Sequence, residues 1–226
     1  MKKFVIIVAA GTGKRFGNKL PKQFELLCGR PMLMYPVETF FKAETGICII
    51  VVIPKNYMDQ WKELCLQYNF NIPHVVIAGG PERFHSVKNG LGLIDDEGMV
   101  AIHDGARPLV SCELIRNAFH SAEKSGAVIP VVGLNDSVRI VTGPVHKAFE
   151  RNKLRLVQTP QVFKCSVLKS AYQQQYQLHF TDDATVAEAA GEKVTLIEGS
   201  TGNIKVTNPQ DLTIAEALLN AKINML

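Results

Sequence analysis

A glycine-rich, basic loop follows the first apolar run of the sequence and is its clearest sign of chemistry. Residues 10–23 read Ala-Gly-Thr-Gly-Lys-Arg-Phe-Gly-Asn-Lys-Leu-Pro-Lys-Gln. Glycines let backbone N–H groups approach an anion closely, and four cations fall within nine residues: Lys14, Arg15, Lys19 and Lys22. A dinucleotide fingerprint would need glycine at Phe16, and a P-loop would need Ser or Thr at Arg15. The loop therefore predicts a triphosphate site of another kind, against the alternative of a solvated turn.

Asp104 is a second candidate. It follows the predicted strand Met99–His103 and should lie at the carboxyl end of that strand, where α/β folds bind ligands. Its carboxylate suits Mg²⁺, which keeps several waters and bridges phosphates. The alternatives are a cap on a turn or an ion pair with Arg107. Because Mg²⁺ prefers oxygen ligands, we expect His103 to pack or to hydrogen-bond rather than to bind metal.

Six stretches carry a family resemblance, in order along the chain. They are Ala9-Ala10-Gly11-x-Gly13-x-Arg15-x-Gly17 with Pro21-Lys22-Gln23, Gly79-Gly80-x-x-Arg83-x-x-Ser86-Val87, His103-Asp104-Gly105-Ala106-Arg107-Pro108, Gln158-Thr159-Pro160-Gln161, Thr181-Asp182-Asp183, and Asn203-Ile204-Lys205-Val206-Thr207. Together they resemble the nucleotidyltransferases, and among these the 2-C-methyl-D-erythritol 4-phosphate cytidylyltransferase family of the non-mevalonate isoprenoid pathway. The resemblance covers essentially the whole chain.

This resemblance implies an enzyme that joins CTP and a polyol phosphate to give a CDP-polyol and pyrophosphate. The attacking phosphate monoester is already anionic, so the reaction needs positioning and cationic stabilisation rather than a general base. By the resemblance, Arg15 and Lys22 would stabilise the transition state. Arg151 and Lys205 would position the acceptor. Asp104 would hold Mg²⁺ or another divalent cation.

Other site residues are implied by the resemblance alone. On the nucleotide side they are Ala9, Ala10, Gly11, Gly13, Gly80, Ser86 and Gly105; on the acceptor side they are Arg107, Thr159 and Ser137. Without the resemblance, Gly79-Gly80 predicts a tight turn, Ser86 a helix start, and Arg151 and Lys205 exposed charges. The stretch Thr181-Asp182-Asp183 is expected to start a helix and to carry no chemistry.

Three positions depart from the family pattern: Gly105 replaces a frequent alanine, Pro81 replaces a frequent polar residue, and Ser137 replaces a frequent threonine. Pro81 removes one backbone donor from the expected base-binding loop. Ser137 keeps the hydroxyl that would contact the acceptor.

The elements that must position these residues alternate between short β-branched runs and helical patterns. Strands are predicted at Lys3–Ala9, Ile47–Ile53, His74–Ala78, Met99–His103, Ala127–Val132 and Lys193–Ile197. Helices are predicted at Met32–Lys42, Asn56–Tyr68, Phe84–Leu93, Ser111–Ser125, Ser166–Tyr176, Asp182–Ala190 and Pro209–Lys222. Nearly continuous apolar strands are typical of a parallel sheet covered by helices on both faces. The expected class is α/β, a doubly wound, mostly parallel Rossmann-like sheet, and the resemblance specifies the nucleotide-diphospho-sugar transferase type.

The α/β alternation stops after Gly133. Residues Leu134–Thr159 predict short extended pieces around the turn Thr142-Gly143-Pro144, and an excursion this long is uncommon without a role. A surface hairpin and an arm that packs on a second subunit both fit the sequence. The resemblance implies the second: a β-arm at 134–159, inside a single domain of residues 1–226, that forms a homodimer.

Composition limits the class of protein. The 226 residues are 46% hydrophobic and 20% charged, which is typical of a globular chain. The formal charge of 25 − 21 = +4 is too small for a chain that coats nucleic acid. The longest apolar runs, Phe4–Ala10 and Ile47–Ile53, have seven residues each, against the roughly 20 that span a membrane. The first run is also too short, and too close to the basic loop, for a signal peptide.

The five cysteines are widely spaced without a C-x-x-C, so we expect reduced thiols and a cytoplasmic enzyme.

Two other functions fit the same sequence. A ribitol 5-phosphate cytidylyltransferase shares the expected fold and most of the motifs, and its acceptor is also a five-carbon polyol phosphate. A non-catalytic nucleotide-binding module is a different class, and the presence of Arg15, Lys22, Asp104, Arg151 and Lys205 counts against it. A dehydrogenase is disfavoured by Phe16.

Overall fold

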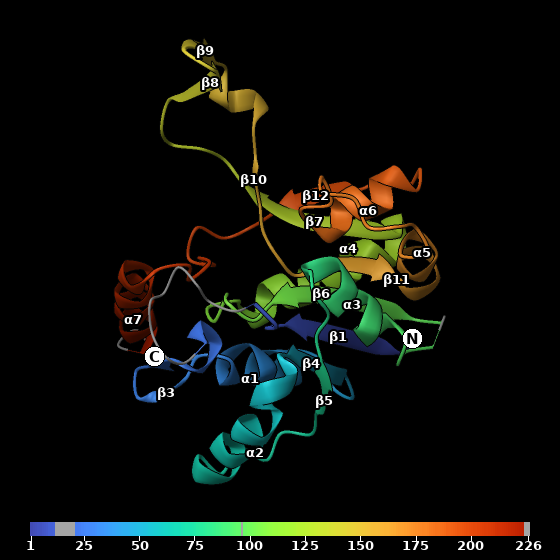
Figure 1. Cartoon of the computed structure of the whole chain (residues 1–226), viewed down its shortest axis with the longest axis vertical. Helices are drawn as coiled ribbons and strands as arrows, with labels where there is room; N and C mark the ends of the chain where they lie inside the picture. The colour runs from blue at the N-terminus through green and yellow to red at the C-terminus, as the bar shows by residue number, and fades with distance from the viewer. Residues whose placement is uncertain (12–20, 96, 224–226) are drawn as a thin grey trace.

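A central sheet of eight strands organises the molecule (Figure 1). The computed structural model describes residues 1–11, 21–95 and 97–223, with side chains as far as Ala221. The strand order is β10-β7-β11-β6-β1-β4-β5, and β12 also pairs with β7. The strands are β1 (Lys3–Val8), β4 (Cys48–Ile53), β5 (Val75–Ala78), β6 (Met99–Asp104), β7 (Ala127–Val132), β10 (Leu156–Val157), β11 (Gln161–Lys164) and β12 (Thr195–Glu198).

The sheet is mostly parallel, as predicted. Strands β6, β1, β4 and β5 run parallel to one another, and β12 runs parallel to β7. Strand β11, which the sequence pattern did not predict, lies antiparallel between β6 and β7, and β10 lies antiparallel on β7. The doubly wound α/β class is therefore confirmed, with antiparallel strands inserted on one side.

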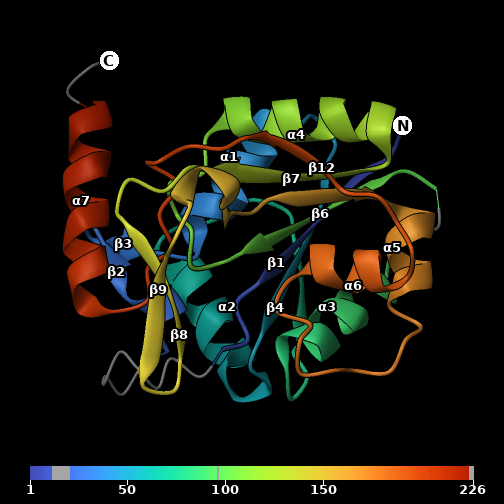
Figure 2. The ribbon, with the colours of Figure 1, turned by 90° about the horizontal axis from the view of Figure 1, so that it is seen from above.

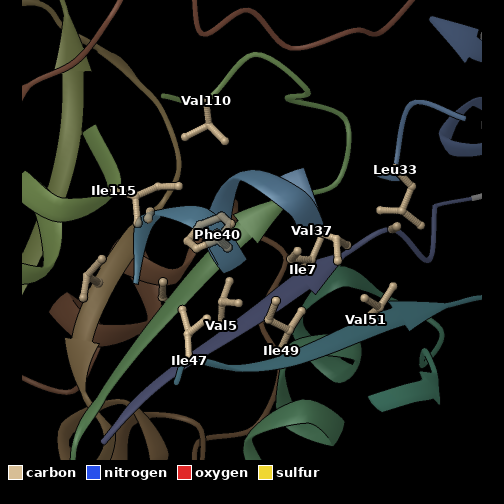
Figure 3. Packing of buried hydrophobic residues seen from close by; sticks show 14 of the residues in the cluster. Val5, Ile7, Leu33, Val37, Phe40, Ile47, Ile49, Val51, Val110 and Ile115 are labelled. Carbon is tan, nitrogen blue, oxygen red and sulfur yellow. The ribbon is translucent and has the colours of Figure 1, made fainter. Parts of the chain in front are cut away.

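Helices cover both faces of this sheet (Figure 2). Helices α1 (Met34–Ala43), α2 (Met58–Gln67) and α4 (Cys112–Ser125) contribute to one buried cluster; α3 (Arg83–Leu91), α5 (Cys165–Ala171) and α6 (Asp183–Ala189) contribute to the other. Side chains of a strand alternate between faces. Val5 and Ile7 of β1 thus pack toward Phe40 of α1 (Figure 3), and Phe4 and Ile6 pack on the opposite face.

A third, smaller cluster attaches the C-terminal helix α7 (Pro209–Ile223) to the hairpin of β2 (Leu26–Leu27) and β3 (Arg30–Pro31). Its buried members are Leu27, Met32, Leu109, Val206 and Ala215. Asn208 caps α7: its Oδ1 accepts a hydrogen bond from the Asp211 N–H at 3.0 Å. In the described part of the chain, the short 3-10 helices are η2 (Lys22–Phe24), η3 (Lys55–Tyr57) and η4 (Arg151–Lys153).

The excursion after Gly133 contains a two-stranded hairpin of β8 (Val138–Thr142) and β9 (Val145–Phe149) that projects from the body (Figure 1). The projecting part is shorter than the predicted 134–159. Strand β10 rejoins the central sheet and Thr159 is buried, because Leu156 and Val157 pair with the backbone of β7.

One other local expectation is wrong: the helix expected at Ser166–Tyr176 ends at Ala171. Residues Asn203–Thr207, which have a β-like composition, form no strand. Val206 instead packs in the cluster beneath α7, and its N–H donates a hydrogen bond to the Ala106 carbonyl at 2.8 Å. Within the described part of the chain, no helix has the length and apolarity needed to cross a membrane.

Candidate active site

A cavity of about 420 Å³ opens at the carboxyl ends of β1 and β6. These strands are paired in register, with Val8 opposite Asp104, so the residues that follow them lie at the same edge of the sheet. The lining comes from these two strand ends, from η2, from the start of α3 and from the loop before α7. It comprises Val8, Ala9, Ala10, Gly11, Lys22, Gln23, Gly80, Pro81, Glu82, Arg83, Ser86, Asp104, Ala106 and Lys205.

The expected nucleotide-side residues form one wall of this cavity. Ala9, Ala10, Gly11, Gly80 and Ser86 all line it. The Gly80 N–H donates a hydrogen bond to Ser86 Oγ at 3.1 Å, and the Ser86 hydroxyl donates to the Glu82 carbonyl at 3.2 Å. Ser86 is the fourth residue of α3, whose N-cap is Glu82, so it does not start the helix as its residue type predicts. Its hydroxyl instead holds the glycine turn against the helix.

Two predicted nucleotide-side positions have a different outcome. Gly105 does not line the cavity: a Cβ there would lie 2.9 Å from both Ala9 Cβ and Leu33 Cδ1, so the glycine permits close packing behind the wall. A direct contact between Gly105 and the nucleotide remains a prediction. Gly13 and the expected catalytic residue Arg15 lie outside the described residues.

Asp104 lies at the centre of the site among three cations. Its Oδ2 is 2.8 Å from Lys205 Nζ and 3.7 Å from Arg107 Nε, and its Oδ1 is 3.5 Å from Arg83 Nε. Burial by itself would raise the pKa of the Asp104 carboxyl, but Arg83 and Lys205 outweigh it and hold that pKa well below its ordinary value. The carboxylate is therefore ionised throughout the physiological range.

Lys22 and Lys205 both line this cavity, and Lys22 binds the backbone of the residue that follows Lys205. The Lys22 ammonium donates a hydrogen bond to the Val206 carbonyl at 2.9 Å. Val206 is itself fully buried in the cluster beneath α7. The packing of the C-terminal helix therefore fixes the loop that presents Lys205 and positions the carbonyl that Lys22 binds.

His103 and Thr159 form a buried hydrogen-bond chain behind Asp104. His103 Nε2 is 3.1 Å from the Arg107 carbonyl, which can only accept, so Nε2 carries the proton. Its Nδ1 then accepts from the Thr159 hydroxyl at 3.1 Å, and that hydroxyl oxygen accepts from the Asp104 N–H at 3.0 Å. Burial lowers the pKa of His103 to about 4. The histidine is thus neutral and hydrogen-bonding, as expected, and Thr159 supports the Asp104 backbone.

Two further cavities adjoin the first, of about 430 and 250 Å³. Arg107 lines both, and Lys205 lines all three. The Arg107 side chain is fixed by hydrogen bonds to the carbonyls of Asn203 at 2.8 Å and Val157 at 3.3 Å. Lys205 and Arg107 therefore stand where a second anionic substrate could reach a nucleotide in the first cavity.

The two predicted arm residues do not join this cluster within one chain. Ser137 is exposed just before β8. Arg151 is exposed in η4, where its guanidinium donates to the Asn135 carbonyl at the root of the arm. Neither lines the three cavities described above. Their expected role toward an acceptor remains a prediction.

Two charged residues at the site were not assigned a role from the sequence. Arg83, the first residue of α3, faces Asp104, and the start of α6 supplies Asp183, whose Oδ2 accepts from Arg83 Nη2 at 2.6 Å. The predicted helix start is present, with Asp182 as its cap. Arg83 and Asp183 are 100 residues apart, so no local pattern could pair them. The arginine that follows the Gly79-Gly80 turn was the available signal.

A divalent cation fits this donor set. Among the described residues there is no cluster of three His, Cys, Asp or Glu side chains that could hold a metal by itself. Asp104 is an ionised carboxylate at the cavity wall, and Mg²⁺ is commonly bound by one or two carboxylates together with water and substrate phosphates. Asp104 would be the protein ligand of such an ion.

Comparisons with known proteins agree with this geometry. The family model of IspD, 2-C-methyl-D-erythritol 4-phosphate cytidylyltransferase, matches residues 3–221. The enzyme of that name from Phocaeicola vulgatus is 48% identical over 219 residues, which cover 97% of this chain and 100% of the relative. The chain is similar to the crystal structure of 2-C-methyl-D-erythritol 4-phosphate cytidylyltransferase from Thermus thermophilus, with 31% identity and a TM-score of 0.78 over 96% of this chain and 98% of that one. It is also similar to the crystal structure of 4-diphosphocytidyl-2C-methyl-D-erythritol synthase from Anaerococcus prevotii, with 27% identity and a TM-score of 0.82 over 97% of this chain and 96% of that one. The chain therefore belongs to the 2-C-methyl-D-erythritol 4-phosphate cytidylyltransferase family.

Proposed function

We propose that this protein transfers the cytidylyl group of CTP to 2-C-methyl-D-erythritol 4-phosphate, releasing pyrophosphate, in the synthesis of isoprenoid precursors. The observation that carries the proposal is the convergence of Lys22, Lys205 and Asp104 at one cavity whose other wall is a glycine turn. The site is rich in cations, as a reaction between two anions requires.

The proposed step forms one bond and breaks one. A phosphate oxygen of the acceptor attacks the α-phosphorus of CTP, and the bond from that phosphorus to the bridging oxygen of the β-phosphate breaks, so that pyrophosphate leaves. The acceptor oxygen carries no proton that must be removed, so no described residue acts as a base. Lys22, with Arg15, neutralises charge that develops at the α-phosphate, while Lys205 orients the acceptor.

A divalent cation is part of the proposal, with Asp104 as its protein ligand. When bound, such an ion neutralises part of the triphosphate charge. We expect excess EDTA to abolish turnover and added Mg²⁺ to restore it. In the Asp104→Asn variant, more Mg²⁺ should be needed for the same recovery. Full turnover of the wild-type protein in excess EDTA would contradict the metal requirement.

The identity of the acceptor separates the proposal from its nearest alternative. Pyrophosphate release should be measured with CTP and either 2-C-methyl-D-erythritol 4-phosphate or ribitol 5-phosphate, each over a range of concentrations. We expect a clear preference in kcat/KM for the methylerythritol phosphate, in line with the names of the relatives. A preference for ribitol 5-phosphate would overturn the proposed substrate, and no release with either acceptor would favour a non-catalytic nucleotide-binding module.

We further propose that the protein acts as a homodimer, with residues 1–226 as a single unit and the arm as the contact between subunits. The β8–β9 hairpin leaves Val141 70% and Val145 69% exposed. A second copy of the hairpin would bury these side chains around a two-fold axis. Arg151 and Ser137 would then face the partner's cavities lined by Arg107 and Lys205, where the acceptor would bind. Within one chain, neither residue lines these cavities.

A further inference from the structure

A buried ion-pair chain reaches Asp104 through residues other than Lys205. Its outer member is Tyr172 of the turn after α5, whose hydroxyl donates to Asp183 Oδ1 at 2.7 Å. The other oxygen of Asp183 accepts from Arg83 Nη2 at 2.6 Å, and Arg83 Nε faces Asp104 Oδ1. The chain thus connects α5, α6 and α3 to the last residue of β6.

Asp183 binds Arg83 but does not itself line any of the three cavities. Its side chain is fully buried, whereas that of Arg83 is 27% exposed and lines the first cavity. Burial alone would lower the pKa of Arg83, but the carboxylates of Asp183 and Asp104 raise it above its ordinary value, so the guanidinium stays charged. Burial raises the pKa of Tyr172 well above its ordinary value, which keeps its hydroxyl protonated as a donor.

The two contacts of Arg83 are unequal. Its distance to Asp183 is that of a strong charge-assisted hydrogen bond, while 3.5 Å to Asp104 is at the limit of one. A guanidinium without Asp183 could turn and bind both oxygens of Asp104, which is the favoured geometry of an arginine–carboxylate pair. In the observed arrangement Lys205, at 2.8 Å, is the closest of the three cations around Asp104.

We propose that Asp183 is a positioning residue: by holding Arg83, it prevents this guanidinium from closing on Asp104 and so keeps the Asp104 carboxylate accessible to Lys205 and to a divalent cation. The inference rests on the proposed function. It assigns a role to the start of α6, from which the sequence predicted only a helix cap.

The test compares Asp183→Asn with the wild-type protein by three measurements. They are kcat and KM with CTP and 2-C-methyl-D-erythritol 4-phosphate at saturating Mg²⁺, the Mg²⁺ concentration for half-maximal rate, and Mn²⁺ binding by electron paramagnetic resonance with CTP but no acceptor. We expect kcat to fall roughly tenfold or more, the scale of one hydrogen bond to a charged group. Half-maximal rate should need several-fold more Mg²⁺, Mn²⁺ should bind correspondingly more weakly, and the KM for CTP should change by less than about twofold.

A double-mutant cycle with Arg83→Gln identifies the route of the effect. If Asp183 acts through Arg83, adding Asp183→Asn to Arg83→Gln should cause no further loss of kcat or of Mn²⁺ affinity. Additive losses, or wild-type metal affinity and kcat in Asp183→Asn, would overturn the inference. Inactivity of the wild-type protein with these substrates would instead count against the proposed function.

A matched control separates positioning from simple loss of the helix. Thr185→Ala removes half of the capping box at the same helix start, where the Thr185 hydroxyl bonds the Asp182 backbone, without touching Arg83. It should lower thermal stability and leave Mn²⁺ affinity unchanged. If Asp183→Asn does not fold, Tyr172→Phe, which removes only the hydroxyl that orients Asp183, should weaken Mn²⁺ binding in the same direction. Unchanged Mn²⁺ binding in Tyr172→Phe would then overturn the inference.

Discussion

The charge around Asp104 explains how a buried carboxylate can lie in a site for anions. Arg83, Arg107 and Lys205 surround its carboxylate, so the group is compensated more than once. The cluster as a whole stays positive and attracts phosphate. Arg83 also binds Asp183, Arg107 binds the Asn203 carbonyl, and Lys205 lines the cavities. Asp104 therefore holds the three cations together without neutralising the positive charge of the site.

The buried His103 should make the stability of the protein depend on pH. Its pKa is lowered from 6.5 to about 4 by burial, so between these values the unfolded chain binds a proton that the folded one does not. Stability should therefore fall as the pH drops from 6.5 to 4, by about 3 kcal/mol in total. Asp104 does not interfere in this window, because a carboxyl with a lowered pKa loses its contribution only below its ordinary value of 3.8.

The measurement is urea unfolding at several pH values between about 7 and 4, followed by the fluorescence of Trp61, the one tryptophan of the sequence. The His103→Gln variant should have a flatter dependence of unfolding free energy on pH than the wild-type protein. His120→Gln, which changes an exposed histidine on α4, is the control and should keep the wild-type slope. An equal slope in His103→Gln would contradict the assignment.

Lys22 is expected to contribute directly to the rate of the reaction. Lys22 lines the first cavity, and its ammonium donates a hydrogen bond to the backbone next to Lys205. We expect Lys22→Ala to lower kcat by about a hundredfold or more, as does the loss of one preorganised donor to developing charge. Arg15→Ala should have a similar effect. Lys62→Ala, on the exposed side of α2, is the control; wild-type turnover in Lys22→Ala would exclude this role.

At the scale of elements, the sequence predicts well what is buried on both faces. Runs such as Ile47–Ile53 and Met99–Ile102 are apolar throughout because helices cover both sides of the strands. Strand β11 escaped prediction since it has four residues, directly follows Pro160 and owes its place to neighbours far along the chain. Likewise, Asn203–Thr207 has β-forming residues, but packing against α7 decides its course.

The site was predictable to a similar extent. Residue type and resemblance singled out Asp104 and Lys205, which the structure brings to 2.8 Å. The pairing of Arg83 with Asp183 was not predictable, because it depends on how α6 packs beside α3 on one face of the sheet. A helix cap and a buried ion-pair partner have the same sequence signal, an acidic residue before an apolar helix.

The loop after β1 and the glycine turn after β5 lie in close contact at Gly79. A Cβ added to Gly79 would lie 2.3 Å from Ala10 Cβ and 2.9 Å from Ser86 Oγ. Gly79→Ala should therefore push apart the two loops that form the nucleotide wall and raise the KM for CTP several-fold, with a smaller change in kcat. Gly92→Ala, at the end of α3 with its nearest contact at 3.4 Å, is the matched control. An unchanged KM in Gly79→Ala would show that the wall tolerates the added methyl group.

At the scale of the whole molecule, the arm is the part that one chain does not explain. A two-stranded hairpin is marginally stable by itself, and β8–β9 forms its own sheet with both strands largely exposed. The apolar side chains Ile140, Val141 and Val145 remain accessible on it. Pairing with a second arm would remove this apolar surface from water and would give each cavity an Arg151 from its partner.

Mixing two inactive variants tests whether the active site is shared between subunits. Arg151→Ala and Lys22→Ala should each have little activity, and sedimentation should give twice the mass of one chain. After subunit exchange, a mixed dimer has one site with both Lys22 and Arg151 intact and one site with neither. Since random exchange makes half of the dimers mixed, about a quarter of the wild-type activity should return. Mixing Arg151→Ala with the double variant Lys22→Ala/Arg151→Ala is the control and should restore nothing. An active monomer, or no recovery once exchange is demonstrated with labelled subunits, would show that each chain completes its own site and that the arm serves another purpose.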